Sequence, residues 1–293
     1  MNLIVTIPAF NEEKTIGNVI RSIKEILGRE KRKFEILVVD DGSTDHTAEA
    51  AKQAGAEVIK HPKNYGLAET FRTEVDAALK RKADVIVHTD ADGQYLASDI
   101  PKLLAKIGAG YDLVLGSRFL GKIETMPLMK RIGNMAFSYA ISQITRMKIT
   151  DAQTGFRAFT REVAQRATII SNHTYTQEQI IRAVREKFKI AEVPVYFAKR
   201  KDKSRLIGSP FGYAIRAWIN LFRILRDYEP LKFFGAIGGL FFAMGIALGI
   251  WLVYLFLTTG IVGRMPTLIL SMLLITVGAQ IVLFGFLADM MRK

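Results

Sequence analysis

Two long runs without a charged residue restrict the architecture of this sequence most. Residues 233–257 and 267–288 contain no Asp, Glu, Lys or Arg. As a helix, the first run would be roughly 37 Å long, enough to cross a hydrocarbon core of roughly 30 Å. Only residues 258–266 separate the two runs, so they predict a transmembrane hairpin. The alternative is a buried hairpin in the core of a soluble protein.

Basic residues flank the outer ends of both runs, and the connection between them carries one cation, Arg264. The flanking cations are Arg223, Arg226, Lys232, Arg292 and Lys293. The positive-inside rule then predicts a multi-pass protein of the cell membrane, with its first domain and both termini in the cytoplasm. The pairs Gly235/Gly239 and Gly245/Gly249 have the spacing of closely packed membrane helices. The hairpin is therefore where copies of the chain would associate in a homo-oligomer.

The rest of the chain is basic and has a sizeable apolar content. The 293 residues are 49% hydrophobic, and the net charge is +13. Such a surface suits anionic partners: phosphates, acidic lipid headgroups or nucleic acid. The absence of cysteine excludes disulfides and thiolate metal sites. Met1–Asn2 runs directly into a strand-like segment, so no signal peptide is expected. Neither a Ser-His-Asp order nor G-x-S-x-G is present, so nothing indicates nucleophilic hydrolysis.

Apolar runs alternate with helical patterns in the first 120 residues, which predicts an α/β fold with a mostly parallel sheet. Strands are expected at 3–7, 36–39, 57–59, 85–87 and 112–115, with Pro8 ending the first. In such a sheet, ligands bind beyond the carboxyl ends of the strands. Four polar segments follow strands and should share that edge: Pro8–Glu12, Asp40–Asp45, Asp90–Gln94 and Arg118.

The segment after the fourth strand carries the strongest chemical signal. Asp90 and Asp92 are one residue apart and precede Gly93, which suits a hard cation such as Mg²⁺ or Mn²⁺ that shares substrate phosphates. The alternative for this pair alone is a solvated Asp-Gly turn. Asp41 is positioned to hydrogen-bond a base or ribose, and Arg118 to meet a phosphate. His88 is interpreted as a packed strand residue.

Three basic segments follow the sheet. A helical pattern at 127–147 fits either a helix on a membrane surface or a core-facing helix with a solvated basic side. Residues 199–205 hold five cations in seven residues, which predicts a solvated loop or, beside a diphosphate, a clamp for the leaving group. Residues 210–228 predict an amphipathic helix at the membrane interface.

Together these segments resemble the family 2 glycosyltransferases with a GT-A fold, in the branch of dolichol-phosphate mannose synthase and polyprenyl-phosphate glycosyltransferases. The likeness rests on Pro8–Glu12, Val39–Asp45, Asp90–Gln94, Gly116–Arg118 and Asp151–Arg157. It implies a Rossmann-like GT-A domain at 1–205, an amphipathic juxtamembrane helix at 206–230 and a transmembrane hairpin at 231–293.

The resemblance also implies the activity and the site. A sugar would pass from GDP-mannose or UDP-glucose to dolichyl or polyprenyl phosphate, with inversion, on a protein that binds no nucleic acid. Asp90, Asp92 and Arg118 would be catalytic, and Asp92 and Gln94 would hold Mg²⁺ or Mn²⁺. Arg118, Arg131 and Asn134 would bind the acceptor phosphate. The donor would be bound by Pro8, Phe10, Glu12, Val39, Asp41, Asp90, Ala91, Asp92, Gln94, Arg200 and Arg205.

Two other functions fit parts of the sequence. Asp90-Ala91-Asp92-Gly93 also fits the D-x-D-G of haloacid-dehalogenase phosphatases, but that reading leaves the Pro8 and Asp40 segments unexplained. A non-catalytic, basic membrane-associated binding protein would explain the charge, but it leaves the acidic strand ends unexplained. The product separates the three: a lipid-linked sugar, free phosphate or neither.

Overall fold

The structure is a computed structural model that describes residues 1–30, 33–170, 175–199, 222–223, 225–261 and 264–291. Arg200 and Arg205, which were predicted to bind the donor, lie outside the described residues, as does most of the predicted helix at 206–230. The chain forms two compact units, Met1–Pro210 and Phe211–Lys293, and each is described by itself.

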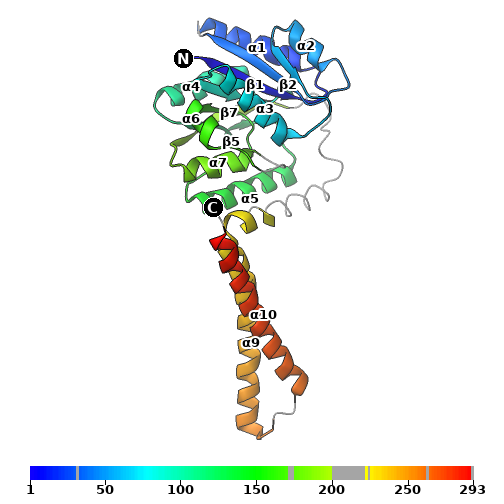
Figure 1. Ribbon diagram of the computed structural model, residues 1–293, viewed down its shortest axis with the longest axis vertical. Coiled ribbons are helices and arrows are strands. Elements are labelled where there is room, and N and C mark those ends of the chain that lie inside the picture. Colours follow the sequence, from blue (N-terminus) through cyan, green and yellow to red (C-terminus); the bar gives the residue numbers. More distant parts are fainter. Residues whose placement is uncertain (31–32, 171–174, 200–221, 224, 262–263, 292–293) are drawn as a thin grey trace. The chain divides into compact units, whose positions relative to one another are not determined.

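The first unit is built on a seven-stranded sheet in the order β3-β2-β1-β4-β6-β5-β7 (Figure 1). The strands are β1 (Leu3–Ala9), β2 (Phe34–Asp40), β3 (Glu57–Lys60), β4 (Val85–His88), β5 (Leu113–Ile123), β6 (Arg157–Thr160) and β7 (Ile190–Phe197). Among the described strands only β6 is antiparallel to its neighbours, β4 and β5. The carboxyl ends of the other strands and the start of β6 therefore share one edge. The predicted mostly parallel α/β sheet is confirmed.

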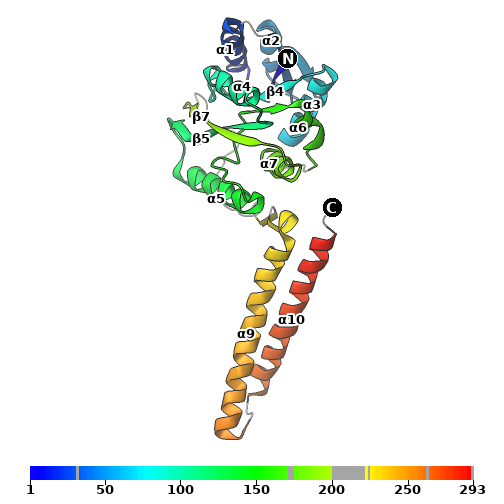
Figure 2. The ribbon, with the colours of Figure 1, turned by 90° about the vertical axis from the view of Figure 1, so that its left-hand side faces the viewer.

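Helices cover both faces of this sheet (Figure 2). On one face lie α1 (Ile16–Arg29), α2 (Thr47–Gln53) and α4 (Ile100–Gly108), the last preceded by the one-turn helix η1 (Ala97–Asp99). On the other lie α3 (Leu67–Lys80), α6 (Arg161–Arg166) and α7 (Thr176–Arg185). The helix α5 (Leu128–Thr145) follows β5. In α1 the buried residues recur at helical spacing, so one apolar stripe packs on the sheet.

The strand β1 continues through Pro8 to Ala9, whereas the sequence predicted that Pro8 ends it. Thr6 O accepts a hydrogen bond from Thr89 N on the β4 side, and Pro8, two residues further on, faces the same side. Because β4 ends at His88, which pairs with Thr6, no ladder bond requires an N–H at Pro8.

Two parts of the sheet differ from the sequence prediction. The strand β5 is longer than the predicted 112–115, because it continues along β7 beyond an irregularity between Ser117 and Lys122. The strand β6 was not predicted, because Arg157–Thr160 contains no apolar run like Val85–Val87, which marked the equally short β4.

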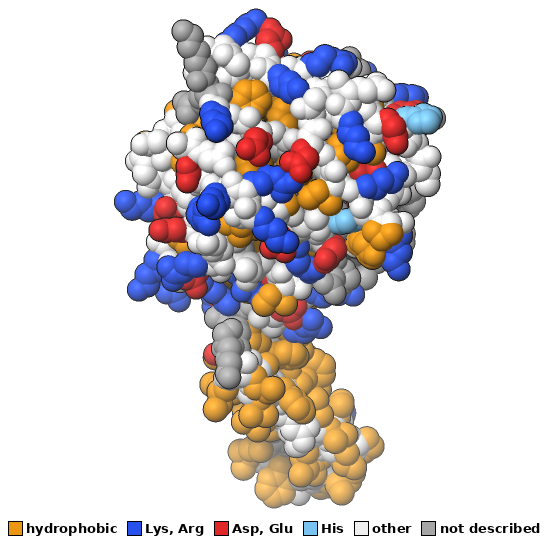
Figure 3. All heavy atoms as spheres, turned by 45° about the horizontal axis from the view of Figure 1, so that its top comes forward, with side chains coloured by type: hydrophobic (Ala, Val, Ile, Leu, Met, Phe, Trp, Pro, Cys, Tyr) orange, Lys and Arg blue, Asp and Glu red, His pale blue; other side chains and the backbone are white. Residues whose placement is uncertain are grey.

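The second unit contains the two expected apolar helices, α9 (Pro230–Thr259) and α10 (Met265–Met290), each long and apolar enough to cross a membrane. They pack closely through small residues. A Cβ on Gly238 would lie 2.6 Å from Gly278 O, and Ser271 Oγ donates to Gly245 O at 2.8 Å. A Cβ on Gly235 or Gly239, in contrast, would meet no described atom within 4 Å. In Figure 3 the surface of the hairpin is largely hydrophobic, whereas charged side chains of both signs are spread over the first unit.

Candidate active site

The carboxyl edge of the sheet brings together the predicted residues of strands β1, β2, β4 and β5. Phe10 and Glu12 lie in the loop after β1, and Asp90 and Asp92 lie in the loop after β4. Pro8, Val39 and Arg118 lie within β1, β2 and β5. The side chains of Val39 and Ala91 are buried, whereas that of Phe10 is exposed. Beside Asp92 opens a cavity of about 390 Å³, lined also by Lys14, Asn18, Thr89 and Lys199.

The loops after β1 and β2 hold each other through polar contacts that the sequence alone did not reveal. Asn11, with a left-handed φ of 54°, donates its N–H to Ser43 Oγ at 2.8 Å. Its Oδ1 accepts from Thr44 N at 2.8 Å, and Glu12 N donates to Thr47 Oγ1 at 2.8 Å. These bonds fix the two loops that carry Phe10 and Glu12.

The carboxylate of Asp41 is already enclosed by donors. Its oxygens accept hydrogen bonds from Tyr65 N and Gly66 N, both at 2.9 Å. His61 Nδ1 lies 2.8 Å from Asp41 Oδ1, and Asp41 is only 5% exposed. In this arrangement Asp41 ties the loop 61–66 to the end of β2. The predicted contact of Asp41 with a base or ribose stays a prediction.

The loop after β4 is tied to the end of β7. Gln94 Nε2 donates to Ala198 O at 3.0 Å, and Ala198 N donates to Gln94 O at 2.8 Å. Gln94 N also donates to Asp92 Oδ1 at 3.0 Å. Gly93 adopts a φ of 73°, which favours glycine over other residues. The turn therefore holds the Asp92 carboxylate above the sheet edge.

Asp90 lies deeper than Asp92, against the loop that precedes β6. An added Cβ on Gly155 would lie 2.7 Å from Asp90 Oδ1, so only glycine leaves room for this carboxylate. Desolvation, followed by the negative charge of Asp92, raises the pKa of Asp90 to about 6. Two neighbouring carboxylates, Asp90 and Asp92, are a suitable donor set for a divalent cation.

The remaining ligands of such a cation would have to come from elsewhere. Within the described part of the chain, no group of three or more His, Cys, Asp or Glu residues is arranged to hold a metal ion. Mg²⁺ is commonly bound by one or two carboxylates together with substrate phosphates, so Asp90 and Asp92 fit this mode. Gln94 offers an amide oxygen, although its Nε2 is engaged with Ala198 O.

Arg118 is buried and paired with an acid that the sequence analysis did not single out. Its Nε and Nη2 donate to the two oxygens of Asp151 at 2.7 and 2.8 Å, and its backbone N donates to the same carboxylate at 3.1 Å. The guanidinium also lies over the Phe197 ring, 5.2 Å from its centroid. The carboxylate of Glu192 accepts from the backbone N–H groups of Thr150 and Asp151 and so orients this loop. Recognising β6 as antiparallel was the missing signal, since that brings the loop 149–156 to this edge.

A second buried polar cluster lies behind β4. His88 is fully buried, which confirms the interpretation of a packed strand residue. Its Nδ1 lies 2.8 Å from Glu74 Oε2, and its Nε2 lies 2.7 Å from the hydroxyl of Tyr175. Burial raises the pKa of Glu74, although His88 opposes this effect. The cluster joins α3, β4 and the start of α7.

The two residues predicted to meet the acceptor on α5 have different environments. Arg131 is exposed and forms no ion pair with a described residue. Asn134 is buried, and its Oδ1 has no hydrogen-bond partner among the residues described. Of the cations predicted for the acceptor, Arg131 is thus open to a ligand, whereas two nitrogens of Arg118 are engaged by Asp151.

Known proteins are similar to this chain in sequence and in fold. The model of the family described as "Glycosyl transferase family 2" matches residues 4–167. Over 285 residues the chain is 30% identical to glycosyltransferase AglJ of Haloferax volcanii, covering 97% of this chain and 91% of that protein. Over 217 residues it is 37% identical to the dolichyl-phosphate hexose transferase of the same organism, covering 73% and 90%.

A solved structure shares the fold. Glucosyl-3-phosphoglycerate synthase of Mycobacterium tuberculosis, crystallised with Mn²⁺, uridine diphosphate and phosphoglyceric acid, has a TM-score of 0.57 at 21% identity. The match covers 75% of this chain and 78% of that one. It supports the predicted GT-A fold.

Proposed function

The chain belongs to glycosyl transferase family 2, and we therefore propose that it transfers one sugar from a nucleotide-sugar donor to dolichyl or another polyprenyl phosphate. The product would be a lipid-linked monosaccharide. The observation that carries this proposal is the meeting of Asp90, Asp92 and the Arg118–Asp151 pair at one sheet edge. The dolichyl-phosphate hexose transferase to which the chain is similar supports the choice of acceptor.

The donor would lie across the loops after β1, β2 and β4. Pro8, Phe10, Glu12, Val39 and Asp41 would surround the nucleotide, with Ala91, Arg200 and Arg205 completing the donor site. Asp92 and Gln94, with Asp90, would hold Mg²⁺ or Mn²⁺, which would neutralise charge on the diphosphate. The Mn²⁺ and uridine diphosphate in the related crystal structure support this use of the edge.

The reaction needs little covalent assistance from the protein. A phosphate monoester has a second pKa of about 6, so its oxygen is already a nucleophile at neutral pH. That oxygen attacks the anomeric carbon while the bond to the donor diphosphate breaks, and the nucleoside diphosphate leaves with the electron pair. A single displacement of this kind inverts the anomeric configuration. The side chains position the two substrates and stabilise the leaving group.

The acceptor phosphate would be met by Arg118, Arg131 and Asn134. The amide Nδ2 of Asn134, whose described acceptor is Met126 Sδ at 4.0 Å, and the open guanidinium of Arg131 are the donors that support this assignment. Arg binds a phosphate through a planar fork, which Lys does not offer.

The lipid acceptor requires a place at a membrane. The apolar helices α9 and α10 would span it as a hairpin, with both termini and the catalytic domain at 1–205 in the cytoplasm. The juxtamembrane helix at 206–230 would lie at the interface, before the hairpin at 231–293. Carbonate extraction should leave the protein in the membrane pellet, and full release to the supernatant would contradict the hairpin.

The two other functions find no support. The matched family consists of glycosyl transferases, not phosphatases. A non-catalytic binding protein would leave the paired acids and the buried arginine at the sheet edge without a role.

The proposal is tested with the purified protein, dolichyl phosphate, Mn²⁺ and a panel of labelled nucleotide sugars that includes GDP-mannose and UDP-glucose. We expect label in the organic phase with one donor and its loss in Asp92→Asn. Release of free phosphate or free sugar without lipid product, across the whole panel, would contradict the proposal.

A further inference from the structure

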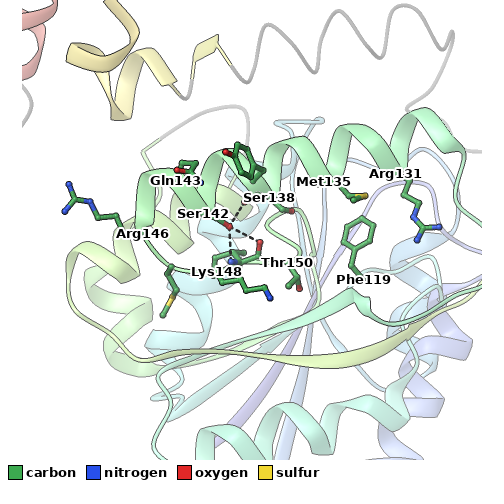
Figure 4. A pocket seen from close by; sticks show the side chains of 12 residues that line it. Phe119, Arg131, Met135, Ser138, Ser142, Gln143, Arg146, Lys148 and Thr150 are labelled. Atoms are coloured by element: carbon green, nitrogen blue, oxygen red, sulfur yellow. Dashed lines mark hydrogen bonds between the residues drawn. The ribbon is translucent and has the colours of Figure 1, made fainter. Parts of the chain in front are cut away.

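A groove of about 810 Å³ lies beneath α5 and contains neither Asp90 nor Asp92 (Figure 4). Its wall is largely apolar, with Phe119, Met135 and Met147 among the lining residues. Ser142 and Thr150 supply polar atoms, and Ser142 Oγ donates to Ser138 O and Ile149 O. The groove is therefore amphipathic, and it lies outside the proposed donor site.

The charge of this groove has one sign. Arg131, Arg146 and Lys148 line it, and no carboxylate is among its described lining residues. None of the three forms an ion pair with another described side chain. Arg131 lies at one end and Arg146 at the other, with Lys148 beneath the helix between them (Figure 4). Fifteen residues of helix correspond to roughly 22 Å, so one phosphate cannot contact both arginines.

Arg146 has a left-handed backbone conformation that Lys82 and Lys187 also adopt just after α3 and α7. It ends α5 with φ 54° and ψ 28°, the left-handed conformation that Gly and Asn adopt more readily. A non-glycine residue in this region is strained, but a basic residue recurs in it at three described helix ends of this chain, so the strain by itself marks no ligand site. The strain places an exposed cation just beyond the last helical turn, next to the second exposed cation, Lys148.

The exposed apolar side chains of α5 fit a bilayer, and two of them, Met135 and Tyr139, also line the groove. Leu128, Ile132, Met135 and Tyr139 recur at helical spacing, and each is more than half exposed. Lys130 and Arg131 lie between Leu128 and Ile132 in the sequence. An exposed apolar stripe bordered by cations is the pattern of a helix that lies in the headgroup region.

We propose that the Arg146 end of this groove binds the phosphate of an anionic phospholipid, whose acyl chains lie along the apolar wall. The proposed acceptor residue Arg131 lines the other end of the same groove, so the proposed phosphate site lies at the opposite end from the acceptor phosphate. A polyprenyl phosphate whose phosphate lies at Arg131 has an uncharged isoprenoid chain. It would therefore gain no ionic contact from cations roughly 22 Å away, at the Arg146 end. A second, anionic amphiphile matches both the apolar wall and the far cations.

The test uses the full-length protein in bilayers of phosphatidylcholine with a minor share of phosphatidylglycerol. After extraction with detergent, both retained lipids are quantified by mass spectrometry. The double variant Arg146→Asn with Lys148→Gln removes both charges and gives position 146 a residue suited to its backbone. Two cations at an anionic surface are worth roughly a tenfold preference or more, so the retained ratio of phosphatidylglycerol to phosphatidylcholine should fall roughly tenfold. The melting temperature should not fall.

The matched control is Lys33→Gln with Lys52→Gln, which removes two exposed cations elsewhere and should retain the wild-type ratio. Equal lipid ratios in the wild type and the Arg146/Lys148 double variant would overturn the proposal, and so would an equal loss in the control. Dolichyl phosphate is then added in excess to the wild type. Persistence of the bound phosphatidylglycerol supports a separate site, whereas its displacement assigns the groove to the acceptor. Lipid retention is read without sugar transfer, so it is independent of the proposed activity.

Discussion

Two aspartates at the same edge of one sheet have opposite environments. Asp41, beyond β2, accepts hydrogen bonds from Tyr65 N and Gly66 N and lies beside His61. Asp90, beyond β4, lies close to a second carboxylate, and its pKa is raised to about 6. The first carboxylate has its hydrogen-bond donors within the fold, whereas the second would be stabilised by the proposed divalent cation. Two acids at the carboxyl edge can therefore have different environments, and the hydrogen-bond donors around each carboxylate distinguish a structural role from a role in binding a ligand.

The arginines show the same contrast. Arg118 is buried and held by both oxygens of Asp151, and Arg131 is exposed without a described ionic partner. A buried, paired arginine is a fixed charge, and an open one gains a partner only from a ligand. Four substitutions or titrations test whether these paired and open groups differ as described.

The largest expected effect is at the acidic pair. Asp92→Asn should lower the rate of sugar transfer roughly a thousandfold, because metal-assisted charge stabilisation is worth several kcal/mol. The fold should persist, since the change is isosteric. The control is Asp76→Asn, an acid on α3 away from the edge, which should keep the wild-type rate. Near-normal turnover of Asp92→Asn at low Mn²⁺ would remove Asp92 from the proposed metal ligands.

The second effect concerns stability rather than rate. Asp41→Ala leaves Tyr65 N, Gly66 N and His61 without their acceptor, so the free energy of unfolding should fall by about 2–4 kcal/mol. Asp90→Asn should not destabilise the metal-free protein at neutral pH. Both are measured by denaturant unfolding of the detergent-solubilised protein. If Asp41→Ala kept full stability and raised only the KM for the donor, the two aspartates would have the same role.

The third effect is a dependence on pH in the absence of divalent cations. The folded pKa of Asp90, about 6, lies above its ordinary value of 3.8, so folding favours the protonated acid. This contribution to stability is complete below pH 3.8 and is lost as the pH rises through about 6. This contribution is at most about 3 kcal/mol, and screening by solvent at the carboxylate reduces it. As the pH rises from 3.8 to about 6, the melting temperature should fall more in the wild type than in Asp90→Asn. Parallel curves of melting temperature against pH would refute the raised pKa of Asp90.

The smallest effect is expected at the open arginine. Arg131→Ala should raise the KM for polyprenyl phosphate about tenfold, which corresponds to about 1.4 kcal/mol, and change the KM for the nucleotide sugar little. Arg131→Lys should recover part of the loss. Steady-state kinetics in detergent micelles, with each substrate varied in turn, give both constants. An unchanged KM for the lipid with a weakened donor would place Arg131 in the donor site.

The sequence predicted the parts of this molecule that depend on local pattern. The strands β1 to β5 and the two apolar helices have distinct periodicity or length, and the acids after β4 follow from strand position. The Arg118–Asp151 pair did not, because it joins residues 33 apart, and the loop with Asp151 reaches this edge through the unpredicted antiparallel strand β6. The enclosure of Asp41 also depends on a distant loop, 61–66, whose backbone donors carry no sequence signature.

The packing of the hairpin could also be predicted only in part, because the spacing of glycines in the sequence does not show which side of α9 faces α10. The predicted pairs Gly235/Gly239 and Gly245/Gly249 were chosen for their separation in sequence. In the structure, Gly245 and Gly249 face Ser271 of α10, so this pair packs closely as predicted, and Gly238 faces α10 as well. A Cβ on Gly235 or Gly239, in contrast, would meet no described atom within 4 Å. Which side of a uniformly apolar helix packs inward is decided by the partner helix, which a pattern within one helix does not contain.

The reversed strand β6 also sets the order in which this molecule can assemble during synthesis. The strand β5 leaves the ribosome before β6, yet β6 separates it from β4 in the sheet. A nascent chain that ends before residue 157 therefore has four adjacent strands, β3-β2-β1-β4, and both acids of the β4 loop. It has no neighbouring strand for β5, and the edge of β4 stays open to pairing with other chains. Arg118 can take its place beside Asp151 only after β6 has emerged, so the site closes late in translation.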